Sequence, residues 1–199
     1  MRESGFNLVE MLVVFVIMGI LLGLGFPSYR TYMANQKLLS TAEVFMAGLQ
    51  MARAEAVKLN QRTEFIVTDD APTAASVDTT NTSTTGRNWI VRALVAGGNT
   101  FVEGKSGAEG SGAATSGASP IAVAGSIPAI TFDGFGMPVG LAAVATFQFS
   151  NPTAGDCATS GGAGGPIRCV VVRVSRGGQT RLCDPAVAAA DTRSCGSGT

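Results

Sequence analysis

Four cysteines near the C-terminal end are the residues of this chain best suited to covalent chemistry. The chain has 199 residues, and positions 157, 169, 183 and 195 are cysteines that follow one another at intervals of 12, 14 and 12. Zinc ligands usually include a pair only about two to four residues apart, which this set lacks. We therefore expect disulfides formed in an oxidising compartment. Four cysteines allow three pairings, and we favour the sequential one, Cys157 with Cys169 and Cys183 with Cys195.

Catalytic motifs are the next chemistry to consider. The chain contains no histidine, which excludes Ser-His-Asp and Cys-His sites and the usual catalytic zinc sites. The segment 97–106 is similar to a phosphate-binding loop, but five residues rather than four separate Gly98 from Gly104. A Gly/Ala/Ser tract follows it in place of a helix. We expect no enzyme activity, no metal and no cofactor.

Arginines give the C-terminal end a positive charge within a chain whose formal net charge is zero. Residues 61–156 sum to −4, whereas residues 157–199 sum to +3, from five arginines against Asp184 and Asp191. Contacts to a phosphate backbone need positive charge, so a DNA-binding patch is one interpretation, with Arg176 and Arg181 as its main candidates. The alternative is a solvated strand face whose charges keep the domain soluble. The absence of nearby aromatic residues argues against base stacking. The five arginines are Arg168, Arg173, Arg176, Arg181 and Arg193.

Glu10 is an acid inside an otherwise apolar run. From Leu8 to Phe26 all residues except Glu10 are apolar or glycine. As a helix, these 19 residues span roughly 28 Å, which is enough to cross a bilayer. The small residue Gly5 precedes the run, so the run is not a cleavable secretory signal. A carboxylate costs about 2.5–3.5 kcal/mol at the bilayer centre, so Glu10 should have a partner. The alternative is a plain signal anchor whose Glu10 reaches the headgroups.

One long helix must position these residues. We expect it from Asn7 to about Asn60, roughly 80 Å long. Pro27, with Gly23 and Gly25 before it, predicts a break in that helix. Beyond the break an apolar stripe recurs at helical spacing, and we expect it to pack in the core rather than form a partner-binding groove. The stripe consists of Leu38, Ala42, Phe45, Leu49, Ala52, Ala56 and Leu59.

After Gln61 the pattern changes to short β-rich runs. The predicted strands are Glu64–Thr68, Trp89–Val95, Ile130–Phe132, Thr146–Ser150 and Cys169–Ser175, and the last should form a hairpin with Gln179–Leu182. In that hairpin Val170, Val172 and Val174 form an apolar face. We expect mobile surface loops at Asp69–Asn88, Gly104–Gly125 and Asn151–Pro166. The fold class is α+β, a long helix packed on an antiparallel sheet.

The N-terminal residues Gly5-Phe6-Asn7-Leu8-Val9-Glu10 resemble the signature of the type IV pilin and pseudopilin superfamily, with Asn7 where Thr is more usual. This resemblance implies that a prepilin peptidase cuts between Gly5 and Phe6 and methylates the amino group of Phe6. The new N-terminus of one subunit could then carry the positive charge that Glu10 of its neighbour needs for subunit assembly.

Two C-terminal segments, Ile130–Pro138 and Gly178–Cys183, resemble the minor pilin and pseudopilin family that includes FimT, FimU and GspH. The implied organisation is a leader (1–5), a transmembrane and filament-core segment (6–27), an amphipathic continuation (28–60) and a periplasmic β-rich domain (61–199). The chain would sit in the inner membrane as a single-pass protein before it enters a pilus or pseudopilus. Implied partners are other minor pilins and the major pilin, or pseudopilins, with the prepilin peptidase, the inner-membrane platform protein and, indirectly, the assembly ATPase.

The resemblance implies a structural minor pilin that primes assembly of a type IV pilus at the tip. One alternative is a pseudopilin of type II secretion, although the cysteines favour a pilus protein. The other is a DNA-binding minor pilin for natural transformation. FimT-like members bind DNA through Gly-Arg-x-Arg, and here Gly178-Gln179-Thr180-Arg181 has Gln179 in place of the first arginine.

Overall fold

The structure is a computed structural model that describes residues 7–107, 119–160 and 164–196. The chain forms two compact units, Met1–Met33 and Ala34–Thr199, which share one helix and are described separately below. The predicted cleavage and methylation site at Gly5 and Phe6 lies outside the described residues.

Helix α1 spans Leu8–Leu59, close to the range predicted from the sequence. Asn7 caps its start, because the Asn7 carbonyl accepts the Glu10 N–H at 3.0 Å and the Asn7 side chain accepts the Val9 N–H at 3.4 Å. At the other end Asn60 has a φ of +49°. The N–H groups of Asn60 and Gln61 donate to the carbonyls of Val57 and Ala56, the two bonds of a Schellman cap.

Between Leu8 and Leu22, α1 is apolar on all sides apart from Glu10. The large apolar side chains from Leu8 to Leu22 are between 46% and 79% exposed. Among the described residues no single helix is long and apolar enough to cross a membrane. The segments Leu8–Gly23 and Ser28–Leu59, bent by 41° relative to each other, have the required length and composition when taken together. Residues 24–27, around the weak point predicted at Pro27, are helical and lie between the two segments of the bent pair. Proline removes one backbone donor and can be carried in a bent helix.

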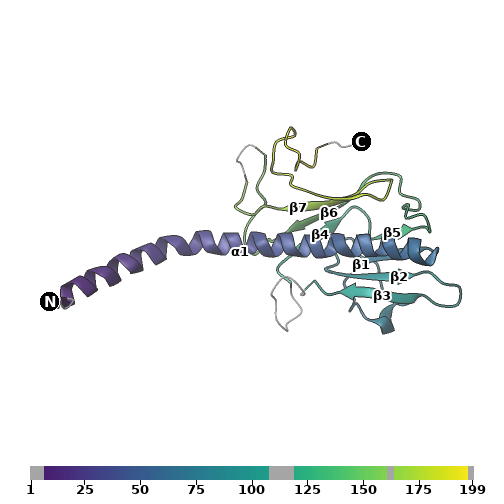
Figure 1. Cartoon of the computed structure of the whole chain (residues 1–199), viewed down its shortest axis with the longest axis horizontal. Coiled ribbons are helices and arrows are strands. Elements are labelled where there is room, and N and C mark those ends of the chain that lie inside the picture. The colour runs from purple at the N-terminus through teal and green to yellow at the C-terminus, as the bar shows by residue number, and fades with distance from the viewer. Residues whose placement is uncertain (1–6, 108–118, 161–163, 197–199) are drawn as a thin grey trace, which may run out of the picture. The chain divides into compact units, whose positions relative to one another are not determined.

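The second unit contains two four-stranded antiparallel sheets, in agreement with the predicted α+β class. The first has the order β3-β2-β1-β5 and the second the order β4-β6-β7-β8. In Figure 1, β1–β3 and the strands β4, β6 and β7 lie on different sides of the C-terminal half of α1. The bounds are β1 Thr63–Thr68, β2 Asn88–Ala93, β3 Thr100–Lys105, β4 Ala122–Gly125, β5 Ala129–Phe132, β6 Ala145–Ser150, β7 Val170–Val174 and β8 Thr180–Cys183.

The core forms where the apolar stripe of α1 meets both sheets. Phe45 shows the arrangement best, because its ring contacts Phe65 of β1 and both Phe147 and Phe149 of β6, with centroids 4.8, 4.9 and 5.2 Å apart. One turn later Gly48 makes room for the indole of Trp89, since a Cβ at Gly48 would lie 2.8 Å from a ring carbon. A single helix therefore holds the two sheets together.

The stripe prediction is confirmed from Leu38 to Ala56, all of whose predicted members are buried, but it is wrong at Leu59, which is 43% exposed. The helix ends there, so Leu59 has no sheet beneath it. The apolar face of Val170, Val172 and Val174 is confirmed as buried. The short helix η1 (Ala74–Ser76) lies within the predicted loop Asp69–Asn88.

The prediction of a loop at Gly104–Gly125 is wrong at both ends of this range. It overlaps the end of β3, which the sequence analysis missed entirely, and it includes the whole of β4. Ile121, just before β4, and Val123 within it explain the error, because both are buried in the core although their neighbours in sequence are Pro120, Ala122, Ala124 and Gly125. Burial of these two side chains outweighs the weak strand preference of their neighbours.

Candidate functional site

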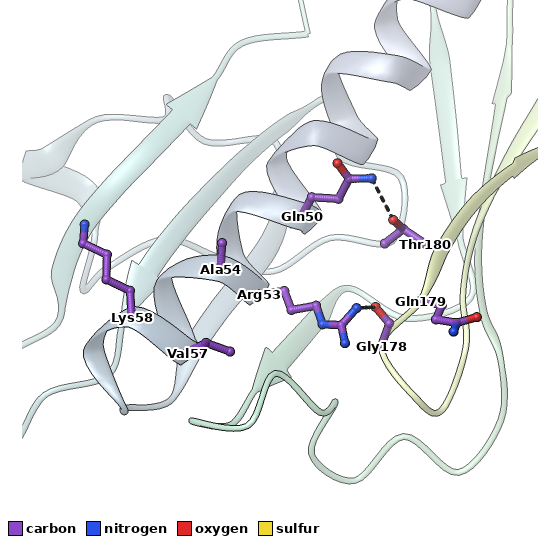
Figure 2. A pocket seen from close by; sticks show the side chains of 8 residues that line it. All are labelled: Gln50, Arg53, Ala54, Val57, Lys58, Gly178, Gln179 and Thr180. Atoms are coloured by element: carbon purple, nitrogen blue, oxygen red, sulfur yellow. Dashed lines mark hydrogen bonds between the residues drawn. The ribbon is translucent and has the colours of Figure 1, made fainter.

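The C-terminal end of α1 meets the turn between β7 and β8. Arg53 Nη1 donates to the Gly178 carbonyl oxygen at 3.1 Å, and Gln50 Nε2 donates to Thr180 Oγ1 at 3.1 Å (Figure 2). A groove of about 740 Å³ runs between these two segments. Its lining consists of Gln50, Arg53, Ala54, Val57, Lys58, Gly178, Gln179 and Thr180.

A second turn, between β5 and β6, lies against the same place. The Asp133 carboxylate accepts the N–H groups of Phe135 at 3.0 Å and Met137 at 2.9 Å, which fixes this turn. Gly178 has a φ of +74°, and a Cβ added there would lie 2.7 Å from the Gly136 carbonyl oxygen. Both turns are thus pressed together at a position that only glycine suits. We call the end of α1 from Arg53 to Leu59, with turns 133–139 and 175–179, the turn surface.

The turn surface exposes apolar side chains. Phe135 is 86% exposed, and Met137, Val139, Val57 and Leu59 are exposed as well. Among the described residues of the second unit, these five make up most of the exposed large hydrophobic side chains; Met51 and Val95 are the others. Isolated exposed apolar residues are ordinary, but a concentration on one fixed surface marks a site of interaction.

The arginines predicted to form a basic patch are mostly engaged within the fold. Arg173 Nη1 donates to the carbonyls of Cys195 at 3.1 Å and Gly196 at 2.8 Å. Arg181 Nη2 donates to the carbonyls of Thr192 and, at 3.4 Å, Ser194. Both side chains therefore hold the loop that follows β8, which the prediction from charge alone did not anticipate.

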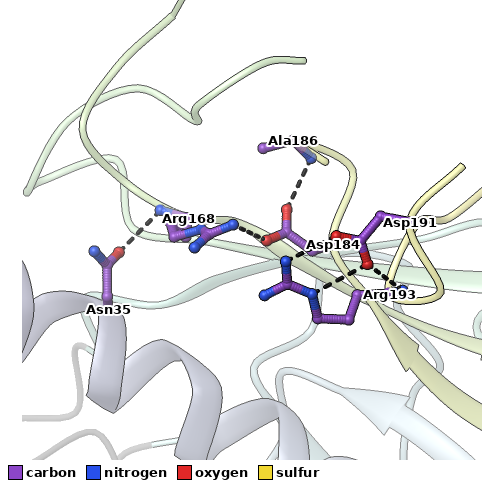
Figure 3. A network of polar contacts seen from close by, with 6 residues as sticks. All are labelled: Asn35, Arg168, Asp184, Ala186, Asp191 and Arg193. Carbon is purple, nitrogen blue, oxygen red and sulfur yellow. Dashed lines mark hydrogen bonds and ion pairs between the residues drawn. The ribbon is translucent and has the colours of Figure 1, made fainter. Parts of the chain in front are cut away.

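Two further arginines pair with carboxylates (Figure 3). Arg168 Nη2 lies 2.8 Å from Asp184 Oδ2, and Arg193 Nη2 lies 2.8 Å from Asp191 Oδ2. The hydrogen bonds from the Arg193 side chain and backbone lower the pKa of Asp191 from 3.8 to about 2. The same ion pair raises the pKa of Arg193.

Arg176 is the remaining member of the predicted patch. It lies exposed in the β7–β8 turn, and within residues 7–107, 119–160 and 164–196 it has no salt-bridge partner. The structure therefore separates the two candidates for DNA binding, since Arg176 is available on the turn surface while Arg181 is bound to the C-terminal loop.

Two disulfides close the C-terminal part of the chain. Cys157 is bonded to Cys169 and Cys183 to Cys195, each with a sequence separation of 12. This is the sequential arrangement among the three possible pairings. The second disulfide joins the end of β8 to the loop that Arg173 and Arg181 hold.

Glu10 lies exposed in the first turn of α1. The side chains around it in sequence, from Leu8 to Leu12, are apolar and exposed too. Its position at a helix N-terminus is favourable for a negative charge.

Sequence reasoning missed the turn surface. It noted the segment Ile130–Pro138 and the glycines of the β7–β8 turn, but nothing in their spacing said that the two would touch. The signal available was a glycine in each segment, Gly136 and Gly178, because glycine favours tight turns. In the structure both glycines have a positive φ.

An apolar N-terminal helix that continues into the core of an antiparallel β domain defines the type IV pilin-like class of structural subunits. The family model described as type II transport protein GspH matches residues 41–185, more than half of the chain, and the chain belongs to this family. It is a minor pilin or pseudopilin and not an enzyme. Proteins of this kind function in complexes with other pilins or pseudopilins, anchored in the membrane with the globular domain in the periplasm.

Solved structures similar to the chain include the type IV minor pilin FimU of Pseudomonas aeruginosa in two crystal forms. One form has 19% sequence identity and a TM-score of 0.49, and the match covers 73% of this chain and 87% of that chain. The other has 18% identity and a TM-score of 0.47, and the match covers 72% of this chain and 90% of that chain. The minor pseudopilin EpsH from the type 2 secretion system of Vibrio cholerae has 15% identity and a TM-score of 0.45, and the match covers 75% of this chain and 98% of that chain. No curated protein matches the chain.

Proposed function

We propose that the chain is a minor pilin of a type IV pilus that primes assembly at or near the tip. A prepilin peptidase removes residues 1–5, cutting between Gly5 and Phe6, and methylates Phe6. Residues 6–27 then hold the subunit in the inner membrane, with residues 28–60 continuing the helix into the β-rich domain of residues 61–199. The platform protein and the assembly ATPase move it into the filament.

The observation that carries this proposal is the apolar surface of α1 between Leu8 and Leu22, exposed on all sides. A helix that is apolar all round needs an apolar environment. Lipid provides one before assembly, and the packed helices of neighbouring subunits provide one afterwards.

Glu10 gives that apolar surface a specific partner. An acid within a membrane segment is costly unless a positive group meets it. The amino group created at Phe6 of a neighbouring subunit supplies this charge when two helices pack side by side. Docking through Glu10 therefore fixes the axial position of one subunit against the next.

Glu10→Ala tests the proposal, with Glu10→Gln as a matched variant that keeps the size of the side chain. Both variants should insert and be processed as the wild type is, but should be missing from sheared filaments. Mass spectrometry of the native protein should find N-methylated Phe6 as its first residue. Normal incorporation of both variants, or a native chain that keeps Met1, contradicts the proposal.

A type II secretion pseudopilin is the second candidate, and the description of the matching family model favours it. The processing, the membrane anchor and Glu10 would serve in the same way, with pseudopilins as neighbours. A deletion strain scored for surface pili, DNA uptake and exoprotein secretion distinguishes these functions. Loss of pili alone supports the first candidate, loss of secretion the second, and loss of DNA uptake with intact pili the DNA-binding alternative.

A further inference from the structure

We propose that the turn surface docks onto a neighbouring pilin-type subunit, which receives Phe135 in an apolar socket and places a carboxylate against Arg176. This inference rests on the proposed function, because it supposes that the chain is built into an assembly. It assigns the contact to one face of the globular domain, separate from the N-terminal helix.

The first step is that the surface is fixed before any partner arrives. Asp133 holds the backbone of Phe135 and Met137 through two hydrogen bonds, and Arg53 holds the β7–β8 turn at Gly178. Gly136 and Gly178 let the two turns approach more closely than side chains would allow. A backbone that is already fixed loses little conformational entropy on binding, so this turn presents Phe135 from a pre-organised position.

The second step is the position of the apolar side chains. Phe45, Phe65, Phe132, Phe147 and Phe149 are all buried, whereas Phe135 is 86% exposed. Met137 and Val57 are exposed beside it, and Val57 lies next to Gly136, since a Cβ there would be 3.1 Å from Val57 Cγ2. An aromatic anchor with apolar neighbours is the usual centre of a protein interface.

The third step is charge. Of the eight residues that line the groove, the two charged ones, Arg53 and Lys58, are both cationic. Figure 2 shows Arg53 turned toward Gly178 and Lys58 away from it. The carboxylates that come from the same segments are already bound, Glu55 to Lys58 at 3.0 Å and Asp133 to backbone N–H groups. Arg176 is left to meet a carboxylate of the partner, which gives the contact its specificity.

Photocrosslinking in cells that assemble the full-length chain tests this inference. A photoreactive phenylalanine at position 135 should give an adduct with another pilin-type subunit, identified by mass spectrometry of the crosslinked band. The same group at Arg87, which is exposed beside the far end of β1, is the control and should give none.

Variants provide the quantitative measurement. Phe135→Ala and Arg176→Glu should each lower the amount of chain in sheared filaments about tenfold, as expected for an anchor of an interface. Phe135→Trp should retain incorporation, and Arg87→Glu, with the same charge change elsewhere, should not affect it. Phe135 and Arg176 are exposed, so thermal unfolding of the variants should match that of the wild type.

Other outcomes overturn the inference. An adduct of the chain only with itself, or a nuclease-sensitive adduct with nucleic acid, assigns the surface to a different occupant. Wild-type incorporation of Phe135→Ala and Arg176→Glu without an adduct overturns it while leaving the proposed function intact. If the unaltered chain is absent from filaments and Glu10→Ala changes nothing, the proposed function fails and this inference fails with it.

Discussion

Arg173 on β7 and Arg181 on β8 are direct cross-strand partners, and both donate to backbone carbonyls of residues 192–196. Like charges directly opposite each other destabilise a strand pair. Here the carbonyls of one loop offset that repulsion by accepting hydrogen bonds from both guanidinium groups. The two arginines thereby stabilise the C-terminal loop, which explains why a basic hairpin need not be a binding site.

Arg181→Ala should therefore act on stability rather than on DNA. Loss of its hydrogen bonds to the loop should lower the free energy of unfolding by about 1 kcal/mol, measured by denaturant unfolding of the full chain in detergent. Binding of duplex DNA at low salt should not change in a gel shift. Arg176→Ala is the control, and its stability should equal that of the wild type. A several-fold loss of DNA affinity in Arg181→Ala, without a loss of stability, would contradict this assignment.

Phe45→Ala should be among the most damaging core substitutions. Its ring contacts aromatic rings in both sheets, so truncation leaves a cavity where the helix joins them. Buried Phe→Ala changes cost about 3–5 kcal/mol. Met51→Ala, an exposed position on the same helix, should change stability by less than about 0.5 kcal/mol. If both variants melt at the same temperature, Phe45 does not join the sheets.

Gly178→Ala and Gly140→Ala form a matched pair. Both glycines have φ near +70°, at +74° and +71°, so alanine at either one pays the same backbone cost, about 1 kcal/mol. Only at Gly178 would the new methyl group meet a neighbour, the Gly136 carbonyl oxygen. Gly178→Ala should thus lower the melting temperature clearly more than Gly140→Ala does. Equal shifts in a thermal scan would show that the two turns are not pressed together.

Acidification should weaken the Asp191–Arg193 pair in a defined window. The pKa of Asp191 is lowered from 3.8 to about 2 by the hydrogen bonds from Arg193. A carboxyl group whose pKa is lowered by folding stabilises the folded state at pH values above its pKa in the unfolded chain. That contribution is lost as the pH falls toward its pKa in the folded protein. An NMR titration should show the pKa of Asp191 at about 2, below its ordinary value of 3.8. In Arg193→Ala its pKa should return toward the ordinary range, and a titration unchanged by that variant would refute the assignment.

The buried faces of helices and strands were predictable where apolar residues recur at a regular spacing in the sequence. The apolar stripe of α1 and the alternation of Val170, Val172 and Val174 identified the helix face and a strand face correctly. In contrast, β3 contains Thr100-Phe101-Val102-Glu103-Gly104-Lys105, in which Gly104 and two charges hide the alternation. β4 is a run of Ala, Val, Ala and Gly, which has little pattern.

The candidate sites divide in the same way. Glu10 and the four cysteines stand out by residue type and spacing, so the sequence was sufficient to name them. The turn surface was not predictable, because it depends on contacts between Arg53 and Gly178, more than a hundred positions apart. Likewise, charge alone could not reveal that Arg181 is used inside the fold.

Both disulfides join cysteines at or beyond position 157, which are synthesised after α1 and the first sheet. The helix and the whole β3-β2-β1-β5 sheet come from residues before position 133. The first sheet can therefore pack on α1 early, yet the domain becomes covalently locked only when the segment from Cys157 to Cys195 reaches a compartment that oxidises thiols. Locking is then a record of export, because a subunit whose cysteines have not reached that compartment keeps reduced sulfurs and a loop after β8 that no disulfide holds.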